Sequence, residues 1–128
     1  MPIHGLAHYN IRAERALMEV LRDFYVAVVG LQEGPRPLAS FGYWLYAGER
    51  DVLHLSETVS GETRRSGSDL TFDHVAFECE NWQEFQSRLE RHAIKFVERG
   101  GQGNVRCQVF FRDPAGNGIE LSFPPATA

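Results

Sequence analysis

The sequence has little of what marks several large classes of protein. It contains only two cysteines, which form no CxxC pair, so no disulfide framework is predicted. The net charge of −4 and the lack of a polybasic run give no electrostatic reason to expect a nucleic acid or a membrane as partner. The longest apolar run, near residues 24–29, is far too short to cross a bilayer.

The N-terminal residues also lack the basic start and apolar segment of a secretory signal, so a cytoplasmic location is expected. Length and apolar content, by contrast, are sufficient for an ordinary globular fold. The 128 residues, 43% of them hydrophobic, can bury a core without outside help. We therefore expect a single domain over residues 1–128.

The first half of this domain, a module over about 4–57, is predicted to hold one helix among strands. Leu17, Leu21 and Phe24 recur at steps of four and three residues, which predicts an amphipathic helix, and Gly30 stands where a C-terminal cap belongs. The turn-rich stretch GPRPL follows. The helix is expected at 14–29 and the strands at 5–13, 40–48 and 51–57.

The second half, a module over about 71–124, repeats this order after a polar linker at 58–70. Asn81 and Glu84 form a start resembling a capping box for its helix. A glycine-rich loop is expected at 99–104, and DPAG supplies the turn between the last two strands. The strands are expected at 71–79, 94–98, 105–112 and 117–123. Both halves read β-α-β-β-β, which predicts an α+β fold of two paired modules that form one curled mixed sheet.

Polar side chains at repeat-related positions point to chemistry. In VLHLSE, Leu53 and Leu55 face one side of a strand and His54 faces the other, and GIELSF places Glu120 in the same way. Aligning the halves pairs His54 with Glu120 on the closing strands and His8 with His74 on the opening strands. If the halves pair about a pseudo-twofold axis, all four side chains converge on one concave face.

The four repeat-related side chains are more informative together than any one of them alone. A single histidine in a strand is more often a hydrogen-bonded, partly buried side chain than a ligand, and one glutamate is often simply solvated. Three histidines and one carboxylate at repeat-related positions are hard to explain in that way. We therefore predict a metal site with the ligands His8, His54, His74 and Glu120.

Four stretches, AHYNIRA, FYVAVVGL, FDHVAFE and FFRDPAGNGIEL, resemble the vicinal oxygen chelate superfamily. This group includes glyoxalase I, extradiol dioxygenases, fosfomycin-modifying enzymes and bleomycin-resistance proteins. The resemblance runs from His8 to Phe123 and implies paired βαβββ modules around a metal site, often completed in a homodimer. By resemblance, His8, His74 and Glu120 match the three ligand positions common to the metal-dependent branches.

The resemblance also shows departures from the known branches. His54 matches a fourth position, where glyoxalase I-like proteins carry a glutamate that doubles as catalytic base. Phe110 matches a tyrosine that holds the phosphonate in the fosfomycin branch, and a phenyl ring cannot form that hydrogen bond. Extradiol dioxygenases usually have longer chains with two such domains.

The resemblance implies a metal-dependent enzyme that acts on a small molecule with adjacent oxygens, as a lyase, an isomerase or a ring-cleaving dioxygenase. One divalent ion per site (Fe, Mn, Ni, Co or Zn) would serve as Lewis acid, because imidazole and carboxylate ligands suit these metals. His54 and Glu120 are the predicted catalytic residues, and His54 is either a fourth ligand or a general acid or base. The alternatives are a non-catalytic drug-binding protein of the bleomycin-resistance type and a fosfomycin-type transferase.

Substrate contacts are expected on the same faces as the ligands. Asn10 alternates with His8, and Arg106, Gln108 and Phe110 share the face that the resemblance makes the cavity side. Ordinary barrel filling is an equally common role for such residues. Tyr43 and Trp44 alternate on a neighbouring strand, so one of them is expected to face the pocket. The expected partners are a small-molecule substrate and a second copy of the chain.

Overall fold

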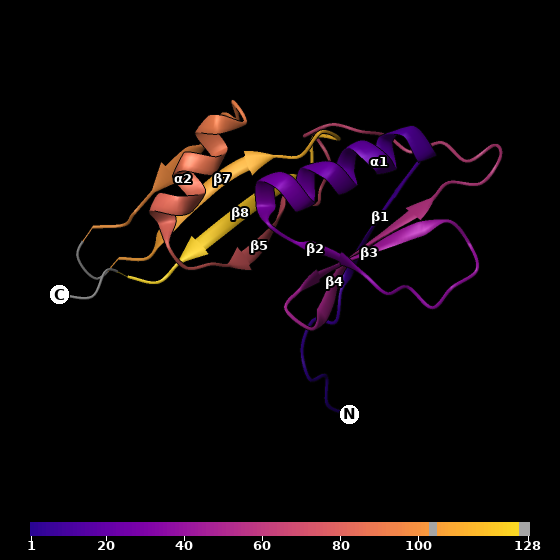
Figure 1. Ribbon diagram of the computed structural model, residues 1–128, viewed down its shortest axis with the longest axis horizontal. Helices are drawn as coiled ribbons and strands as arrows, with labels where there is room; N and C mark the ends of the chain where they lie inside the picture. Colours follow the sequence, from indigo (N-terminus) through magenta and orange to yellow (C-terminus); the bar gives the residue numbers. More distant parts are fainter. Residues whose placement is uncertain (103–104, 126–128) are drawn as a thin grey trace. The chain divides into compact units, whose positions relative to one another are not determined.

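The computed structural model describes residues 1–102 and 105–125 and divides the chain into two compact units, Met1–Arg65 and Ser66–Ala128. The boundary between them falls within the linker predicted at 58–70. Each unit contains one four-stranded sheet and one main helix (Figure 1). Within the described residues, no helix is long and apolar enough to span a membrane.

The first unit is a mixed sheet with a helix across one face. Its strands stand in the order β1-β4-β3-β2, and β1 runs parallel to β4 while the other pairs are antiparallel. Helix α1 packs across β4, β1 and β3. The elements are β1 (Tyr9–Ala13), α1 (Arg15–Phe24), the π-helical turn η1 (Tyr25–Val29), β2 (Gln32–Gly34), β3 (Gly42–Ala47) and β4 (Arg50–Glu57).

The core of this unit explains the alternation along β4. Leu53 and Leu55 are almost fully buried, as are Met18 and Leu21 of α1, whereas His54 between the leucines lies on the opposite face of the sheet. Side chains alternate along a strand, so the apolar positions pack under the helix and leave His54 on the face that α1 does not cover.

The predicted helix at 14–29 is helical from Arg15 to Val29, with Glu14 as its extended N-cap, and its last turn is wound differently from the rest. The backbone N–H of Gly30 donates to the carbonyl oxygen of Tyr25, five residues back, at 2.9 Å, which is a π-helical bond. Gly30 ends the segment with φ 99°, a left-handed conformation that favours glycine. The predicted C-terminal cap is confirmed.

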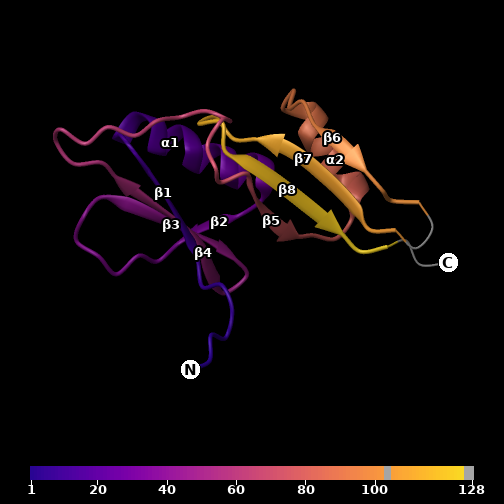
Figure 2. The same cartoon turned by 180° about the vertical axis from the view of Figure 1, so that it is seen from behind.

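The second unit has the same topology, with the order β5-β8-β7-β6 and β5 parallel to β8. Figure 2 shows β8 between β5 and β7 from behind. Asn81 caps the helix as predicted, since its side chain accepts a hydrogen bond from the backbone N–H of Glu84. The elements are β5 (His74–Glu78), α2 (Trp82–Arg91), β6 (Val97–Arg99), β7 (Cys107–Arg112) and β8 (Gly118–Phe123).

Several predicted boundaries were wrong. Strand β1 begins at Tyr9, so His8 precedes the strand instead of lying on it, and β6 begins three residues later than expected. Strand β2 was not located from the sequence, which indicated only a turn-rich edge. Arg99, expected in the glycine-rich loop, ends β6, and residues 103–104 of that loop lie outside the described residues.

The strand registers confirm the repeat. On β4, His54 is paired with Asn10 of β1 and with Trp44 of β3; on β8, Glu120 is paired with Ala76 of β5 and with Phe110 of β7. Each residue of the second set follows its counterpart by 66 positions, as His74 follows His8. The α+β prediction of two βαβββ modules with mixed sheets is confirmed.

Candidate metal centre

The second unit brings a predicted histidine and a predicted carboxylate together. His74 is the first residue of β5 and Glu120 lies in the middle of β8, and the parallel register pairs His74 with Gly118, two residues before Glu120. The Nε2 atom of His74 lies 3.1 Å from Oε1 of Glu120. The Glu120 residue is buried, with 7% of its surface exposed, while the His74 side chain remains 35% exposed.

The turn that joins β7 to β8 explains this placement. The buried Asp113 accepts hydrogen bonds at Oδ1 from the backbone N–H groups of Ala115 and Asn117, each at 2.9 Å. Its Oδ2 accepts a third from the side-chain amide of Asn117 at 2.9 Å. An aspartate that accepts from the backbone within two to four residues stabilises a tight turn. The DPAGN segment therefore sets the β7–β8 register that pairs Glu120 with Phe110.

Further polar contacts hold the pair in place. The Nε2 amide of Gln108 donates to the other oxygen of Glu120, Oε2, at 3.2 Å. On the far side of the imidazole, Nδ1 of His74 lies 2.7 Å from Oδ2 of Asp73. The hydrogen bond to His74 lowers the pKa of Asp73, an effect that desolvation opposes. The carboxylates of Asp73 and Glu120 thus lie on opposite sides of one imidazole.

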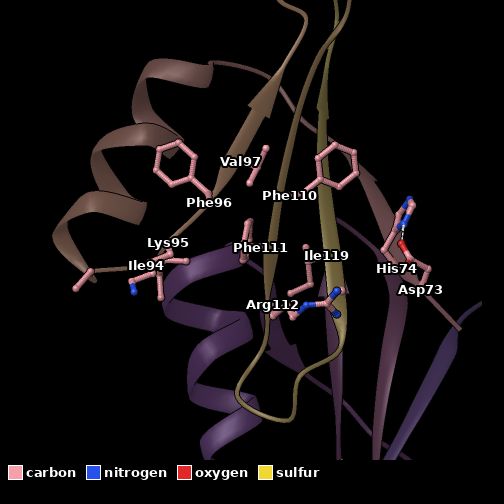
Figure 3. Close-up of a pocket in the computed structure, with 12 residues that line it drawn as sticks. Asp73, His74, Ile94, Lys95, Phe96, Val97, Phe110, Phe111, Arg112 and Ile119 are labelled. Carbon is pink, nitrogen blue, oxygen red and sulfur yellow. Dashed lines mark hydrogen bonds and ion pairs between the residues drawn. The ribbon is translucent and has the colours of Figure 1, made fainter. Parts of the chain in front are cut away.

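A cavity lies beside His74 in the second unit. It has a volume of about 550 Å³ and is lined on one side by Phe96, Val97 and Phe110 and on the other by Asp73 and His74 (Figure 3). The ring of Phe110 meets the His74 ring edge-on, with centroids 5.6 Å apart. The cavity therefore has an apolar wall next to a polar end formed by Asp73 and His74.

In the first unit, His54 lies at the centre of a ring stack. Its ring is stacked on His8 at 3.7 Å between centroids and on Trp44 at 4.2 Å. The His54 side chain is only 12% exposed, and its Nε2 lies 2.6 Å from Oδ2 of Asp51. This hydrogen bond is the main cause of a lowered pKa for Asp51. Of Tyr43 and Trp44, it is Trp44 that faces His54.

The first unit also holds a cluster with the geometry of a cation site. His8, Asp51 and His54 each offer one ligand atom, and these atoms lie within 4.8 Å of one another. Sequence analysis did not identify Asp51, because strict alternation places it on the core side with Leu53. Leu45 pairs with Leu53 but Ala47 pairs with Arg50, so Asp51 and Val52 together oppose one residue of β3. Such a bulge re-aims side chains, which explains how Asp51 reaches His54.

The predicted substrate-binding residues lie, within their own units, on the same sheet faces as the predicted metal ligands. Asn10 is the register partner of His54, and its Oδ1 accepts a hydrogen bond from the Ser56 hydroxyl at 2.8 Å. Arg106, just before β7, donates to the Ser122 hydroxyl at 2.9 Å. Gln108 and Phe110 contact Glu120 and His74, as described above. Their role as substrate contacts remains a prediction.

The sequence matches the model of a known protein family. The family model of the Glyoxalase/Bleomycin resistance protein/Dioxygenase superfamily matches residues 5–121. No curated protein matches the sequence.

Solved structures share the fold at low sequence identity. A glyoxalase/dioxygenase from Nostoc punctiforme is 20% identical with a TM-score of 0.74, and the match covers 96% of this chain and 92% of that one. Lactoylglutathione lyase from Agrobacterium tumefaciens is 21% identical with a TM-score of 0.66, over 96% of each chain. The fosfomycin resistance protein FosX from Mesorhizobium loti is 18% identical with a TM-score of 0.66, over 98% of this chain and 95% of that one. At such identities the structural matches establish the fold alone. The family model covers most of the sequence, however, and the chain belongs to the glyoxalase/bleomycin resistance protein/dioxygenase superfamily.

Proposed function

We propose that this protein is a metal-dependent enzyme that acts on a small molecule with two adjacent oxygen atoms. The observation that carries the proposal is the buried carboxylate of Glu120, 3.1 Å from an imidazole nitrogen of His74 at the edge of a partly apolar cavity. A buried carboxylate needs compensating partners, and a cation shared with His74 would supply one.

The donor set fits a divalent metal ion. It consists of imidazole nitrogens and carboxylate oxygens without a thiolate, which suits Fe, Mn, Ni, Co or Zn. Two atoms that each lie about 2.1 Å from one ion are about 3.0–3.4 Å apart in octahedral or tetrahedral arrangements. The separation of 3.1 Å between Nε2 of His74 and Oε1 of Glu120 agrees with that range.

The proposed ligands are His8 and His54 from the first unit and His74 and Glu120 from the second. Support for a single ion served by both pairs comes from the resemblance to the metal-dependent branches and from the constant 66-residue shift between the pairs. The cluster of His8, Asp51 and His54 supports a competing arrangement, in which the first unit holds an ion by itself.

The metal would act as a Lewis acid, polarising the bound oxygens of the substrate. The other steps of the reaction fall to side chains of the protein. Glu120, oriented by Gln108, is proposed to accept and return a proton. His54, held by Asp51, is proposed for that role only in the alternative in which it is not a metal ligand. Whether the reaction is that of a lyase, an isomerase or a ring-cleaving dioxygenase is decided by the substrate that binds.

Phe110 is proposed to contact the apolar part of the substrate, because its ring lines the cavity next to His74. Arg106 and Asn10 are proposed to contact its polar groups from the same faces, as is Gln108. The phenyl ring of Phe110 offers no hydrogen bond, so fosfomycin-type transfer is the less favoured of the alternatives. A homodimer and a cytoplasmic location complete the proposal.

The first experiment measures bound metal by elemental mass spectrometry on protein purified without a histidine tag. About one ion per chain is expected in the wild type, with loss in His8→Ala and Glu120→Ala. His92→Ala is the matched control, since His92 is exposed at the end of α2. Wild-type protein that takes up none of the five metals on reconstitution would contradict the enzyme proposal and leave a drug-binding protein.

A second pair of variants separates the two metal arrangements. If His8, Asp51 and His54 hold an ion alone, His74→Ala will retain the metal and Asp51→Ala will lose it. If both pairs serve one ion, His74→Ala will lose it. Oxygen uptake with a catechol and proton exchange with a hemithioacetal then distinguish dioxygenase from isomerase or lyase chemistry.

A further inference from the structure

Each of two proposed histidine ligands has one nitrogen beside an aspartate. A neutral imidazole carries a proton on one nitrogen and an electron pair on the other, and only the bare nitrogen binds a metal. A carboxylate accepts but does not donate, so it keeps the proton on the nitrogen that it faces. The position of the aspartate therefore decides which nitrogen is left bare.

At His54 the nitrogen that faces the carboxylate is Nε2, at 2.6 Å from Oδ2 of Asp51. This distance is typical of a charge-assisted hydrogen bond and shorter than the separation of about 3.0 Å or more expected for two ligands of one ion. Asp51 is thus a hydrogen-bond acceptor rather than a second ligand. The stacking of His8 and Trp44 on the two faces of the ring holds its plane. A flip within that plane would place a carbon against the carboxylate.

At His74 the arrangement is reversed. Its Nδ1 lies 2.7 Å from Oδ2 of Asp73, and its Nε2 faces Oε1 of Glu120 at 3.1 Å. Both nitrogens of His74 thus face a carboxylate. The shorter contact, to Asp73, assigns the proton of the neutral ring to Nδ1 and leaves Nε2, on the side of Glu120, as the bare nitrogen. The aspartates stand at different places in the chain, three residues before His54 and directly before His74, so the internal repeat does not explain the reversal.

We propose that Asp51 and Asp73 are positioning residues that hold the two imidazoles in opposite tautomers, leaving Nδ1 of His54 and Nε2 of His74 as the metal-binding nitrogens. The assignment of the metal-binding nitrogens rests on the proposed function, whereas the assignment of the two tautomers does not.

The test is long-range ¹H–¹⁵N correlation NMR on uniformly labelled protein, first metal-free at about pH 8.5, where unperturbed imidazoles are neutral. His54 is expected to show a protonated Nε2 and a bare Nδ1, and His74 a protonated Nδ1. Titration with zinc, which is diamagnetic, should then shift Nδ1 of His54 and Nε2 of His74. A protonated Nδ1 in metal-free His54, or zinc on Nε2 of His54, overturns the proposal.

Variants distinguish a positioning role of the two aspartates from a general contribution to the stability of the fold. In Asp51→Ala, His54 should lose its preference for the Nε2-protonated form while His74 keeps its own, and zinc affinity should fall about 10–100-fold. Asp73→Ala should show the converse. Asp51→Asn, whose amide oxygen still accepts, should restore most of the His54 preference. Asp23→Ala, at an exposed carboxylate paired with Arg22, is the control and should change neither histidine.

The outcomes distinguish this inference from the proposed function. If zinc shifts neither imidazole, the metal proposal fails, and the tautomers measured without metal still decide the role of the aspartates. If zinc binds but Asp51→Ala changes neither the His54 tautomer nor the zinc affinity, the positioning role is overturned while the metal site stands.

Discussion

Glu120 occupies on β8 the place that His54 occupies on β4, 66 residues earlier in the chain. Each is the central member of a strand that pairs in parallel with an opening strand and antiparallel with the strand before it. Each also stands opposite an aromatic residue, Trp44 or Phe110. The repeat thus preserves the position while the side chain changes from imidazole to carboxylate, which leaves the two units with different donors at equivalent sites.

The two faces of β4 predict opposite effects for neighbouring substitutions. Leu53→Ala removes a side chain with no exposed surface and should cost about 2–5 kcal/mol of unfolding free energy. His54→Ala should cost much less stability but abolish or weaken metal binding. Urea unfolding and metal analysis on the same two variants check this. Equal losses of stability would contradict the assignment of His54 to the open face.

The buried aspartate of the β7–β8 turn should be required for stability. Asp113→Ala removes three hydrogen bonds to Ala115 and Asn117, and we expect a loss of about 2–4 kcal/mol. Urea unfolding measures the change, and Asp23→Ala serves as the exposed control. A loss within 0.5 kcal/mol or so of that control would show that the turn forms without the side chain.

Much of the fold and of the candidate site was predictable from the sequence, because it follows from the two-residue alternation of strand side chains and from the residues preferred in caps and turns. Three features are local patterns that each predict one structure: the alternation around His54 and Glu120, the cap at Asn81 and the turn at Asp113. Asp51 was not predictable, because its place depends on a bulge against β3, and a bulge breaks the alternation on which the prediction rested. The start of β1 after His8 depends likewise on where its parallel pairing with β4 begins, at Leu53.

Acid should destabilise the first unit through Glu62. The side-chain hydrogen bond from Arg12, with further ones from Arg64 and the backbone of Val59, lowers the pKa of Glu62 far below its ordinary value of 4.5. A carboxylate with a lowered folded-state pKa stabilises the fold above its unfolded value, and this contribution is lost as the pH falls below about 4.5. Urea midpoints at pH 7 and pH 3 should therefore differ less in Glu62→Gln than in the wild type. Glu49→Gln, at an exposed residue, is the control.

Cys79 should resist alkylation. Burial raises the pKa of its thiol to about 11, so at pH 8 only about one molecule in a thousand carries the reactive thiolate. Burial also raises the pKa of Cys107. Iodoacetamide at pH 8, followed by intact mass, should label neither cysteine over a time that labels both in urea. Fast labelling of Cys79 in the native protein would contradict the assigned burial, and a Cys79→Ala variant would identify the modified residue.

Trp44 should report on the metal site through its fluorescence. Its indole is stacked on His54, whereas the other tryptophan, Trp82, packs against Phe96 and Phe123. A metal bound by His54 changes the charge directly next to Trp44, whose ring is stacked on that imidazole. Zinc should therefore change the emission of the wild type and of Trp82→Phe.

The matched variant Trp44→Phe should keep the metal and lose the fluorescence response. Elemental analysis of that variant confirms that zinc is still bound, because a phenyl ring can stack on the imidazole in place of the indole. A zinc response that persists in Trp44→Phe and disappears in Trp82→Phe would show that the ion acts on Trp82 and not on the indole stacked on His54. That result would contradict His54 as a ligand while leaving the pair of His74 and Glu120 as the remaining donors.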